Sequence, residues 1–317
     1  MRSGSTDKKT FSCECISSVF VSGDTVRLEF IWPGPVPRGG QFFLIKPRRS
    51  GVFLGRPLSV AGWKPRIPYA QNETVERRIQ ADRRLVSSRY ANTKLRLITN
   101  RRVYKDRRQN TAGILQFLVV RRGQGSRELT DLRPGEEAEL TGPLGNFWAQ
   151  MDLNANFPGI AHPPGGKPAG PIAMVGGGVG IAPLLAFITE LKGRYRNRIP
   201  FDFYAGFRTG SFGLENIIAR SLIIATEDGS QGLKGRIPDF FTPLGYRAVL
   251  VCGPEPMLKT VGNACIASRI PCYLSMEKHM ACGVGACLGC TVKTTKGNRR
   301  CCTDGPIFRA EEICFEQ

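Results

Sequence analysis

The amino-acid sequence predicts a multi-domain α+β protein that combines an antiparallel β-barrel domain, an α/β domain with a parallel sheet, and a small C-terminal module. Three observations predict this class. Short strand-like runs separated by turn residues occupy the first part of the chain, strands alternate with a helical segment after residue 171, and the last fifty residues are dense in Cys and Gly. We expect domains at 1–161, 171–265 and 270–317, since 317 residues suffice for two or three compact cores.

The first domain is predicted from short runs rich in β-branched and aromatic residues, each bounded by Gly, Pro or Asp. These runs are 11–21, 25–32, 40–47, 56–63, 114–122 and 136–146. Several short strands separated by turns are typical of a barrel or a sandwich.

A basic insertion at 64–110 interrupts the strand-like runs. It holds 14 Lys and Arg against 4 Asp and Glu, in a chain with a formal net charge of +19. Basic clusters can bind nucleic acid. Its few aromatic residues, Tyr69, Tyr90 and Tyr104, are too scattered to form a platform on which bases would stack, so a solvated insertion is favoured and a nucleic-acid partner is not expected.

The second domain is predicted to follow a Pro- and Gly-rich linker at 162–171. A short apolar strand at 172–175 leads through "GGGVGIAP" into a helical segment at 184–195. Further strand candidates follow at 200–208, 221–226 and 248–254. Strands that alternate with helices indicate a parallel sheet.

Two Gly-rich turns follow strands of this second domain. Gly177, Gly178 and Gly180 open the helix, where backbone N–H groups can approach a pyrophosphate. The spacing is G-x-G-x-x-P, not G-x-G-x-x-G, so this motif alone is a weak indication of nucleotide binding. Cys252, Gly253 and Pro254 form a second turn at a strand end, where ligands bind in open parallel sheets. Cys252 is expected to face the ligand or to be a buried apolar thiol.

The C-terminal module carries the most specific motif of the chain. Cys282, Cys287 and Cys290 have the spacing C-x4-C-x2-C, which is associated with plant-type [2Fe–2S] clusters. Gly283, Gly285 and Gly289 would let the loop turn tightly. A four-cysteine zinc site is the alternative, but such sites usually pair C-x2-C motifs. Spacing alone leaves either Cys301 or Cys302 as the fourth ligand.

Cellular location is predicted from two absences in the sequence. The start of the chain lacks the apolar stretch of a secretory signal, and no apolar run approaches the length of a membrane span. Eleven cysteines, an odd number with six of them between Cys282 and Cys314, favour metal ligation over disulfides. A cytoplasmic protein is therefore expected.

Taken together, the chain resembles the electron-transfer subunits of NAD-dependent (class B) dihydroorotate dehydrogenase, within the ferredoxin-NADP reductase superfamily. The resemblance is carried by "RPLSV", "GQGSREL", "PGEEAELTGPLGN", "GGGVGIAPLL", "ATEDGSQGLKG", "CGPEPML", "MACGVGACLGC" and "CTDGPIF", which run in family order over nearly the whole chain. The basic insertion is much longer than the family's connection at that place. It lies between two strands expected to bind FAD.

This resemblance implies three cofactors, namely FAD on the barrel, NAD(H) on the α/β domain, and a [2Fe–2S] cluster in the C-terminal module. The residues implied at the flavin ring are Arg56, Pro57, Leu58 and Ser59, together with the backbone of Leu118, Val119 and Val120. Gly125 and Ser126 would hold the pyrophosphate of FAD. The family ending "CxDGPxF" aligns Cys302, not Cys301, as the fourth cluster ligand.

The function implied is an oxidoreductase subunit in which a hydride passes between NAD(H) and FAD, and single electrons pass through the cluster. Hydride transfer needs alignment more than acid–base groups, so no catalytic acid or base is expected. The implied partner is the FMN-containing dihydroorotate dehydrogenase of pyrimidine biosynthesis, in a heterotetramer. The alternative is a subunit of another flavoenzyme complex, such as a sulfide dehydrogenase, a transhydrogenase or a hydrogenase diaphorase module.

Overall fold

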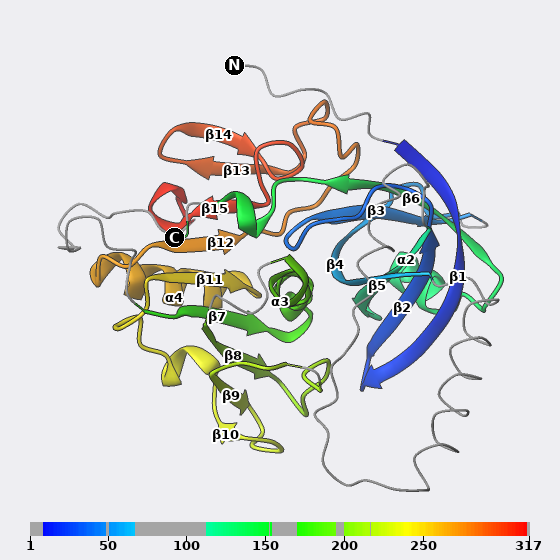
Figure 1. Ribbon diagram of the computed structural model, residues 1–317. Helices are drawn as coiled ribbons and strands as arrows, with labels where there is room; N and C mark the ends of the chain where they lie inside the picture. Colours follow the sequence, from blue (N-terminus) through cyan, green and yellow to red (C-terminus); the bar gives the residue numbers. More distant parts are fainter. Residues whose placement is uncertain are drawn as a thin grey trace, which may run out of the picture.

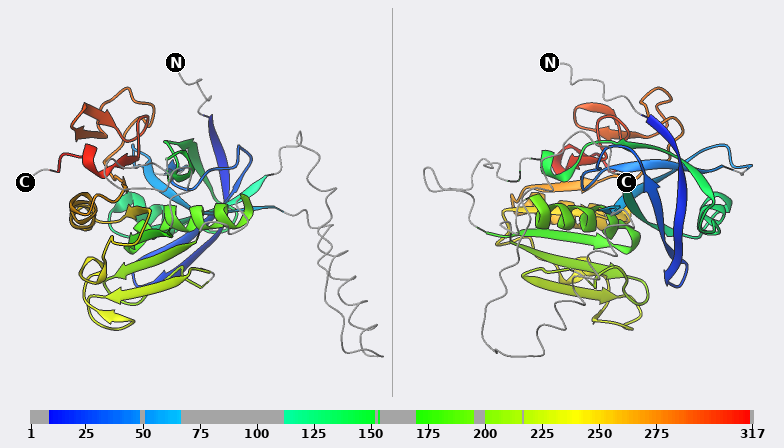
Figure 2. Two further views of the ribbon diagram at one scale, coloured as in Figure 1. Left: turned by 60° about the vertical axis from the view of Figure 1, so that its left-hand side comes forward. Right: turned by 45° about the vertical axis from the view of Figure 1, so that its right-hand side comes forward.

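The computed structural model describes residues 9–48, 51–66, 112–151, 153, 170–194, 200–215 and 217–315. Most of the basic insertion 64–110 and most of the linker 162–171 lie outside these residues. The described part contains a barrel and a sheet side by side, with the C-terminal hairpin next to both (Figures 1 and 2).

The N-terminal strands close into an antiparallel barrel in the order β1-β2-β5-β4-β3-β6. The strands are β1 Lys9–Ser22, β2 Thr25–Trp32, β3 Phe42–Pro47, β4 Arg56–Pro65, β5 Gly113–Val120 and β6 Glu137–Leu144, and helix α2 Gln124–Thr130 joins the last two. Side chains alternate in and out along the strands, and Phe30, Trp32, Phe43 and Phe117 fill the interior with edge-to-face ring contacts. The expected strands are confirmed, and the barrel replaces the sandwich alternative.

The second half forms a seven-stranded sheet in the order β10-β9-β8-β7-β11-β12-β15. Its strands are β7 Ile172–Gly177, β8 Phe201–Phe207, β9 Ser221–Thr226, β10 Leu233–Lys234, β11 Ala248–Cys252, β12 Cys272–Ser275 and β15 Ile307–Arg309. All pair in parallel except β15, which is antiparallel to β12. The predicted parallel sheet is therefore confirmed.

Two helices cover opposite faces of this sheet. Helix α3 Ala182–Arg194 packs Leu184 and Phe187 against the face that carries Ile172 and Met174. Helix α4 Glu255–Ala267 packs against the other face, which carries Ala173 and Val175. Helix α3 also contacts the barrel, which places the barrel and the sheet on either side of it (Figure 1).

The residues expected to form a separate C-terminal module are shared with the sheet. Strands β12 and β15 belong to the sheet, whereas β13 Thr291–Thr294 and β14 Gly297–Arg300 form a two-stranded hairpin. Short 3-10 helices lie at Trp148–Gln150, Gly178–Ile181, Ile237–Phe240 and Ala310–Glu312. The cysteine-rich loop is thus held between a sheet strand and the hairpin.

Candidate cofactor sites

The cysteine-rich loop between β12 and β13 and the turn after β14 bring four thiols together in two pairs. The thiols of Cys282 and Cys287 hydrogen-bond with each other, and so do those of Cys290 and Cys302. Within the described residues, no group of three His, Cys, Asp or Glu side chains is gathered so as to hold a single metal ion. A [2Fe–2S] cluster has four cysteine ligands, two on each iron, and two pairs of thiols fit that requirement.

Backbone N–H groups of the loop point at the first of these thiols. The sulfur of Cys282 accepts hydrogen bonds from the N–H groups of Val284 and Cys287, both at 3.4 Å. Partial burial acts to raise the pKa of this thiol, but the backbone donors outweigh burial and lower the pKa to about 6. The loop is therefore built to hold a thiolate, the form of cysteine that binds metal.

Glycine conformations explain how the loop turns. Gly283 and Gly285 have φ values of +64° and +83°, in the left-handed region that favours glycine. Gly289 is not among the residues with positive φ, and Leu288 takes that conformation beside it, with a φ of +59°. The expectation of a tight turn is met at two of the three glycines, and Gly289 needs no special conformation.

The structure distinguishes the two adjacent cysteines 301 and 302. The sulfur of Cys302 lies against Cys290 and accepts the N–H of Gly285 from the cluster loop. Both side chains are buried in the same hydrophobic cluster, and burial raises the pKa of Cys301 to about 12 and that of Cys302 to about 11. Only the Cys302 thiol makes hydrogen bonds to the cluster loop, which favours Cys302 as the fourth ligand.

The residues expected around FAD gather at one end of the barrel. The Arg56 guanidinium packs so closely on Gly125 that a Cβ at residue 125 would lie 2.4 Å from an Arg56 nitrogen. This contact joins the start of β4 to the first turn of α2, although the two lie far apart in the sequence. The pairing of β4 with β5 ends at Val60 opposite Phe117, so the backbone of 118–120 is not paired with β4. That arrangement fits backbone contacts with a flavin.

Ser126 has a more local role than expected from its side chain. Its hydroxyl accepts the N–H groups of Arg122 and Gly123 at 2.9 and 3.1 Å, and donates to the Gly123 carbonyl. The hydroxyl therefore holds the turn that starts α2. The first N–H groups of a helix have no partner within the helix, so a pyrophosphate would be held by the backbone of this turn.

The Gly-rich turns of the sheet meet at the carboxyl ends of the adjacent strands β7 and β11. A Cβ at Gly180 would lie 2.6 Å from the Cα of Gly253, and a Cβ at Gly253 would lie 3.0 Å from the N of Gly177. Gly178, by contrast, has a φ of +54° and open space beside it. Gly180 and Gly253 therefore allow close packing of the turns, and Gly178 leaves room at the edge where a dinucleotide would bind.

Cys252 is a buried residue at this edge. Its side chain is 1% exposed and its thiol hydrogen-bonds with Ser275 on the neighbouring strand β12. Burial raises the pKa of Cys252 well above its usual range, and the charge of Glu277 acts in the same direction. Of the two expectations for Cys252, the structure supports the buried thiol.

A contact that sequence reasoning missed joins the cluster loop to the barrel. Gly283 lies over Leu44 of β3, where an added Cβ would be 2.6 Å from Leu44 Cδ1. Leu44 is paired with Pro57, one of the residues expected at the flavin. No local motif marks Leu44, because its place beside the cluster loop depends on the packing of two segments about 240 residues apart. The flavin strand and the cluster loop are thus separated by one strand.

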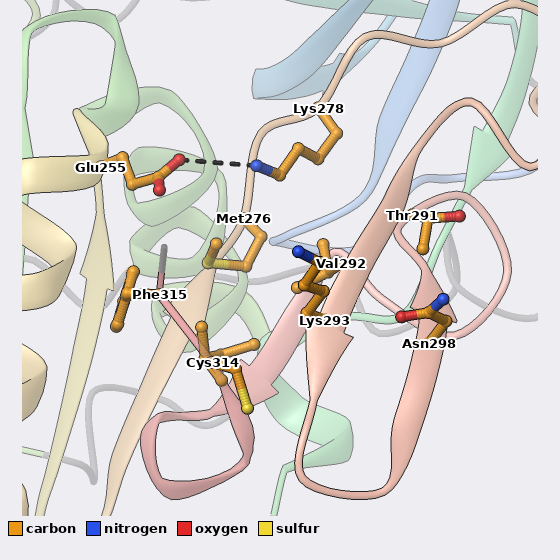
Figure 3. Close-up of a pocket in the computed structure, with 10 residues that line it drawn as sticks. Glu255, Met276, Lys278, Thr291, Val292, Lys293, Asn298, Cys314 and Phe315 are labelled. Atoms are coloured by element: carbon orange, nitrogen blue, oxygen red, sulfur yellow. Dashed lines mark ion pairs between the residues drawn. The ribbon is translucent and has the colours of Figure 1, made fainter. Parts of the chain in front are cut away.

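One further cavity lies apart from these sites, between the start of α4 and the C-terminal hairpin (Figure 3). It has a volume of about 230 Å³, and its walls include Met276, Val292 and Phe315. A Lys278–Glu255 ion pair of 3.5 Å crosses one side. None of the residues expected to bind a cofactor lines it.

Comparison with known proteins assigns the chain to a family. Residues 277–314 match the iron-sulfur cluster binding domain of dihydroorotate dehydrogenase B. The electron transfer subunit of dihydroorotate dehydrogenase B (NAD(+)) from Clostridium acetobutylicum is 41% identical over 201 residues, which cover 63% of this chain and 74% of that relative. The chain belongs to this family of electron transfer subunits.

Another member of the family, from Caldanaerobacter subterraneus subsp. tengcongensis, is 28% identical over 307 residues and aligns with 95% of this chain and 96% of its own. Among solved structures, a chain of an NADH-dependent reduced ferredoxin-NADP oxidoreductase superposes with a TM-score of 0.65 at 22% identity, covering 95% of this chain and 89% of that one. The ferredoxin reductase of carbazole 1,9a-dioxygenase superposes with a TM-score of 0.53 at 18% identity, over 84% and 68% of the two chains. At these identities the structural likeness shows the fold alone.

Membership in the family of dihydroorotate dehydrogenase B electron transfer subunits confirms the resemblance and the fold class expected from the sequence. It also confirms an oxidoreductase subunit that carries an iron-sulfur domain and works with a catalytic partner subunit. The expected cofactors, FAD, NAD(H) and a [2Fe–2S] cluster, are those that this family and fold support. In the part of the chain that the structure describes, no helix has the length and apolar character of a membrane span.

Proposed function

We propose that this chain transfers electrons between NAD(H) and an FMN-containing dihydroorotate dehydrogenase subunit, in a cytoplasmic heterotetramer of pyrimidine biosynthesis. Apart from Cys252, whose thiol is buried against Ser275, the residues proposed to hold the cofactors are those predicted from the sequence. When bound, a flavin links the two-electron chemistry of a nicotinamide to the one-electron chemistry of an iron–sulfur cluster. Electron transfer between these groups depends on how the chain positions them.

The observation that carries this proposal is that Pro57, Leu44 and Gly283 are successive neighbours, which lead from β4 through β3 to the cluster loop. Pro57 and Leu44 are partners in adjacent strands, and Leu44 contacts the glycine that follows the first cluster cysteine. Adjacent strands are about 5 Å apart. The proposed flavin strand is therefore held beside the proposed cluster loop by strand pairing and by packing, which supports direct electron exchange between the two sites.

The nicotinamide would be placed by the turns at the ends of β7 and β11. Leu118 of the barrel lies in the same hydrophobic cluster as Ile181, Ile172 and Cys252 of the sheet domain. The backbone expected to line the flavin is thus packed against the turn expected to hold the dinucleotide. This packing supports a proposed alignment of the two cofactors, and alignment is the requirement of hydride transfer.

The cluster loop exposes apolar side chains to solvent, which supports the partner subunit as the electron acceptor or donor. Cys287 is exposed, and so are the neighbouring apolar side chains of Val284 (48%) and Leu288 (61%). On the barrel, the Lys46 ammonium lies over the ring of Phe53, which is 87% exposed. Apolar side chains gathered around a redox centre are typical of a protein–protein contact.

The proposal is tested by co-expressing the chain with an FMN-containing dihydroorotate dehydrogenase and purifying the complex. We expect a heterotetramer with FAD, FMN, iron and sulfide, and formation of NADH that depends on dihydroorotate. In the matched variant Cys302→Ser, dihydroorotate should no longer reduce NAD⁺, while the catalytic subunit should still reduce an artificial dye. A complex that oxidises NADH with dyes but never couples to dihydroorotate would instead support a subunit of another flavoenzyme.

A further inference from the structure

The side chain of Asn146 connects the barrel to the last strand of the sheet. Asn146 follows β6 by two residues, and the chain after β6 reaches β15 (Figure 1). Its Oδ1 accepts the N–H of Ile307 at 2.9 Å, and its Nδ2 donates to the Ile307 carbonyl at 2.8 Å. One side chain therefore satisfies both backbone groups of a single β15 residue.

Strand β15 requires such a partner because it is the edge of the sheet. Its inner side pairs with β12, where Ile307 lies opposite Ser275. The outer side of an edge strand presents N–H and C=O groups without a strand to pair with. The amide of Asn carries one acceptor and two donors, so Asn146 takes the place that a further strand would occupy.

The backbone around Asn146 is packed so tightly that this connection has little freedom to shift. The N–H of Asn146 donates to the Gly305 carbonyl at 2.7 Å. Gly145 has a φ of +78°, and a Cβ there would lie 2.6 Å from Pro306 Cδ. The segment 305–307 is thus held against the barrel by both backbone and side-chain contacts.

Cys302 lies three residues before this 305–307 segment. The residues between them form a turn in which the N–H of Asp304 donates to the Arg300 carbonyl and the Asp304 carboxylate accepts the N–H of Arg300, both at 2.8 Å. Asn146 Nδ2 also lies 3.4 Å from the Asp304 carbonyl. A displacement of Ile307 would therefore move the turn that holds Cys302.

We propose that Asn146 is a positioning residue that holds Cys302 at a fixed place relative to the flavin barrel. This role rests on the proposed function, in which Cys302 ligates the cluster and the barrel binds FAD. In this role Asn146 acts through Ile307 and the 300–304 turn. Partners that orient a metal ligand in this way typically contribute about 10- to 100-fold to metal affinity or activity.

The test compares the holoprotein with the variants Asn146→Leu and Asn146→Asp. Leucine has a similar size but makes neither hydrogen bond, whereas aspartate keeps an acceptor for the Ile307 N–H. The matched control is Asn298→Leu, the same change on the exposed β14 strand of the hairpin. The readouts are hydrogen exchange at the Ile307 amide, the rate at which an iron chelator bleaches the cluster, and the rates at which NADH reduces flavin and cluster.

We expect Asn146→Leu to lose protection at the Ile307 amide and to release iron about tenfold faster than the wild type, the lower end of the range for residues that orient metal ligands. Flavin content and the rate of flavin reduction should match the wild type, and reduction of the cluster should lag behind. Asn146→Asp should lie between the two, and it carries the test if the leucine variant does not fold. Asn298→Leu should behave as the wild type.

Two results would overturn the positioning role. One is an iron-release rate within twofold of the wild type in a folded Asn146 variant. The other is loss of flavin in step with loss of iron, which would make Asn146 a general support of the fold. A wild-type protein that never holds a cluster would overturn the proposed function itself.

Discussion

The contact between Gly283 and Leu44 leads to a prediction that joins the cluster loop to the barrel. Replacing Gly283 with Ala introduces two costs. The φ of +64° is in the left-handed region, which costs a residue with a Cβ about 1–2 kcal/mol. The new Cβ would also lie 2.6 Å from Leu44 Cδ1, and overpacking of this kind costs about 1–3 kcal/mol. Gly283→Ala is therefore expected to destabilise the protein by about 2–5 kcal/mol.

A matched control and a second variant separate the two costs. Gly297, in the turn of the β13–β14 hairpin, has a φ of +91° with nothing near its Cβ position, so Gly297→Ala should cost only about 1–2 kcal/mol. Leu44→Ala removes the atom that Gly283→Ala would collide with, at its own cost of about 2–5 kcal/mol for a buried leucine. In the double variant the 2.6 Å collision is gone, and Leu144 Cδ1, at 3.1 Å, becomes the nearest side-chain atom.

The assay is urea unfolding of the wild type and the four variants, followed by far-ultraviolet circular dichroism and by the visible absorbance of the cluster. The double variant should be more stable than the sum of the single changes predicts, by about 1–3 kcal/mol. It should also recover cluster content that Gly283→Ala loses. Single changes that add within about 0.5 kcal/mol would refute the contact, because residues that do not touch behave additively.

Three further predictions concern the cluster, the nucleotide turns and the sheet. Cys302→Ser should abolish the paramagnetic signal of the chemically reduced cluster, and Cys301→Ser should retain it; the opposite result would reassign the fourth ligand. Gly180→Ala places a Cβ 2.6 Å from the Gly253 Cα, and overpacking of this kind costs about 1–3 kcal/mol. If this cost falls on the nucleotide site, the KM for NADH should rise about tenfold or more, without loss of FAD. Asp202→Asn should lower the free energy of unfolding by about 2 kcal/mol, because Asp202 accepts two hydrogen bonds from an arginine and one from a tyrosine. The arginine holds the pKa of Asp202 below its usual range, although burial acts in the opposite direction. The stabilisation by Asp202 is therefore complete above about pH 4 and is lost as the pH falls through the lowered pKa. Denaturation curves of variant and wild type that stay apart at low pH would contradict this prediction.

The strands and the cluster loop were predictable because their signals are local. Short strand-like runs separated by turn residues identified the six barrel strands, and the spacing of Cys282, Cys287 and Cys290 identified the cluster motif. Gly289 shows the limit of local reasoning. Three glycines were expected to relieve the loop, but Leu288 takes one of the left-handed positions. Composition shows that a loop turns tightly, but not which of its residues adopt the left-handed conformation.

The boundary of the C-terminal module was less predictable for a similar reason. Residues 270–317 look like one unit because of their Cys and Gly content, but β12 and β15 within them belong to the sheet. Membership in a sheet depends on hydrogen bonds with distant strands, which composition does not reveal. The role of Cys252 was also left open by the sequence. Its burial against Ser275 supports the buried thiol, and contact with a ligand stays a prediction.

The sequence by itself determined the fold class, the family and the cysteines that fit an iron–sulfur cluster, since each depends on residue type and on short spacings along the chain. Only the tertiary structure decided how the sites lie relative to one another. It placed Gly283 over Leu44 and joined Asn146 to Ile307, pairs separated by more than 150 residues. The physical reason is that such contacts arise from the packing of complete surfaces, and no local pattern of residues encodes which two surfaces meet.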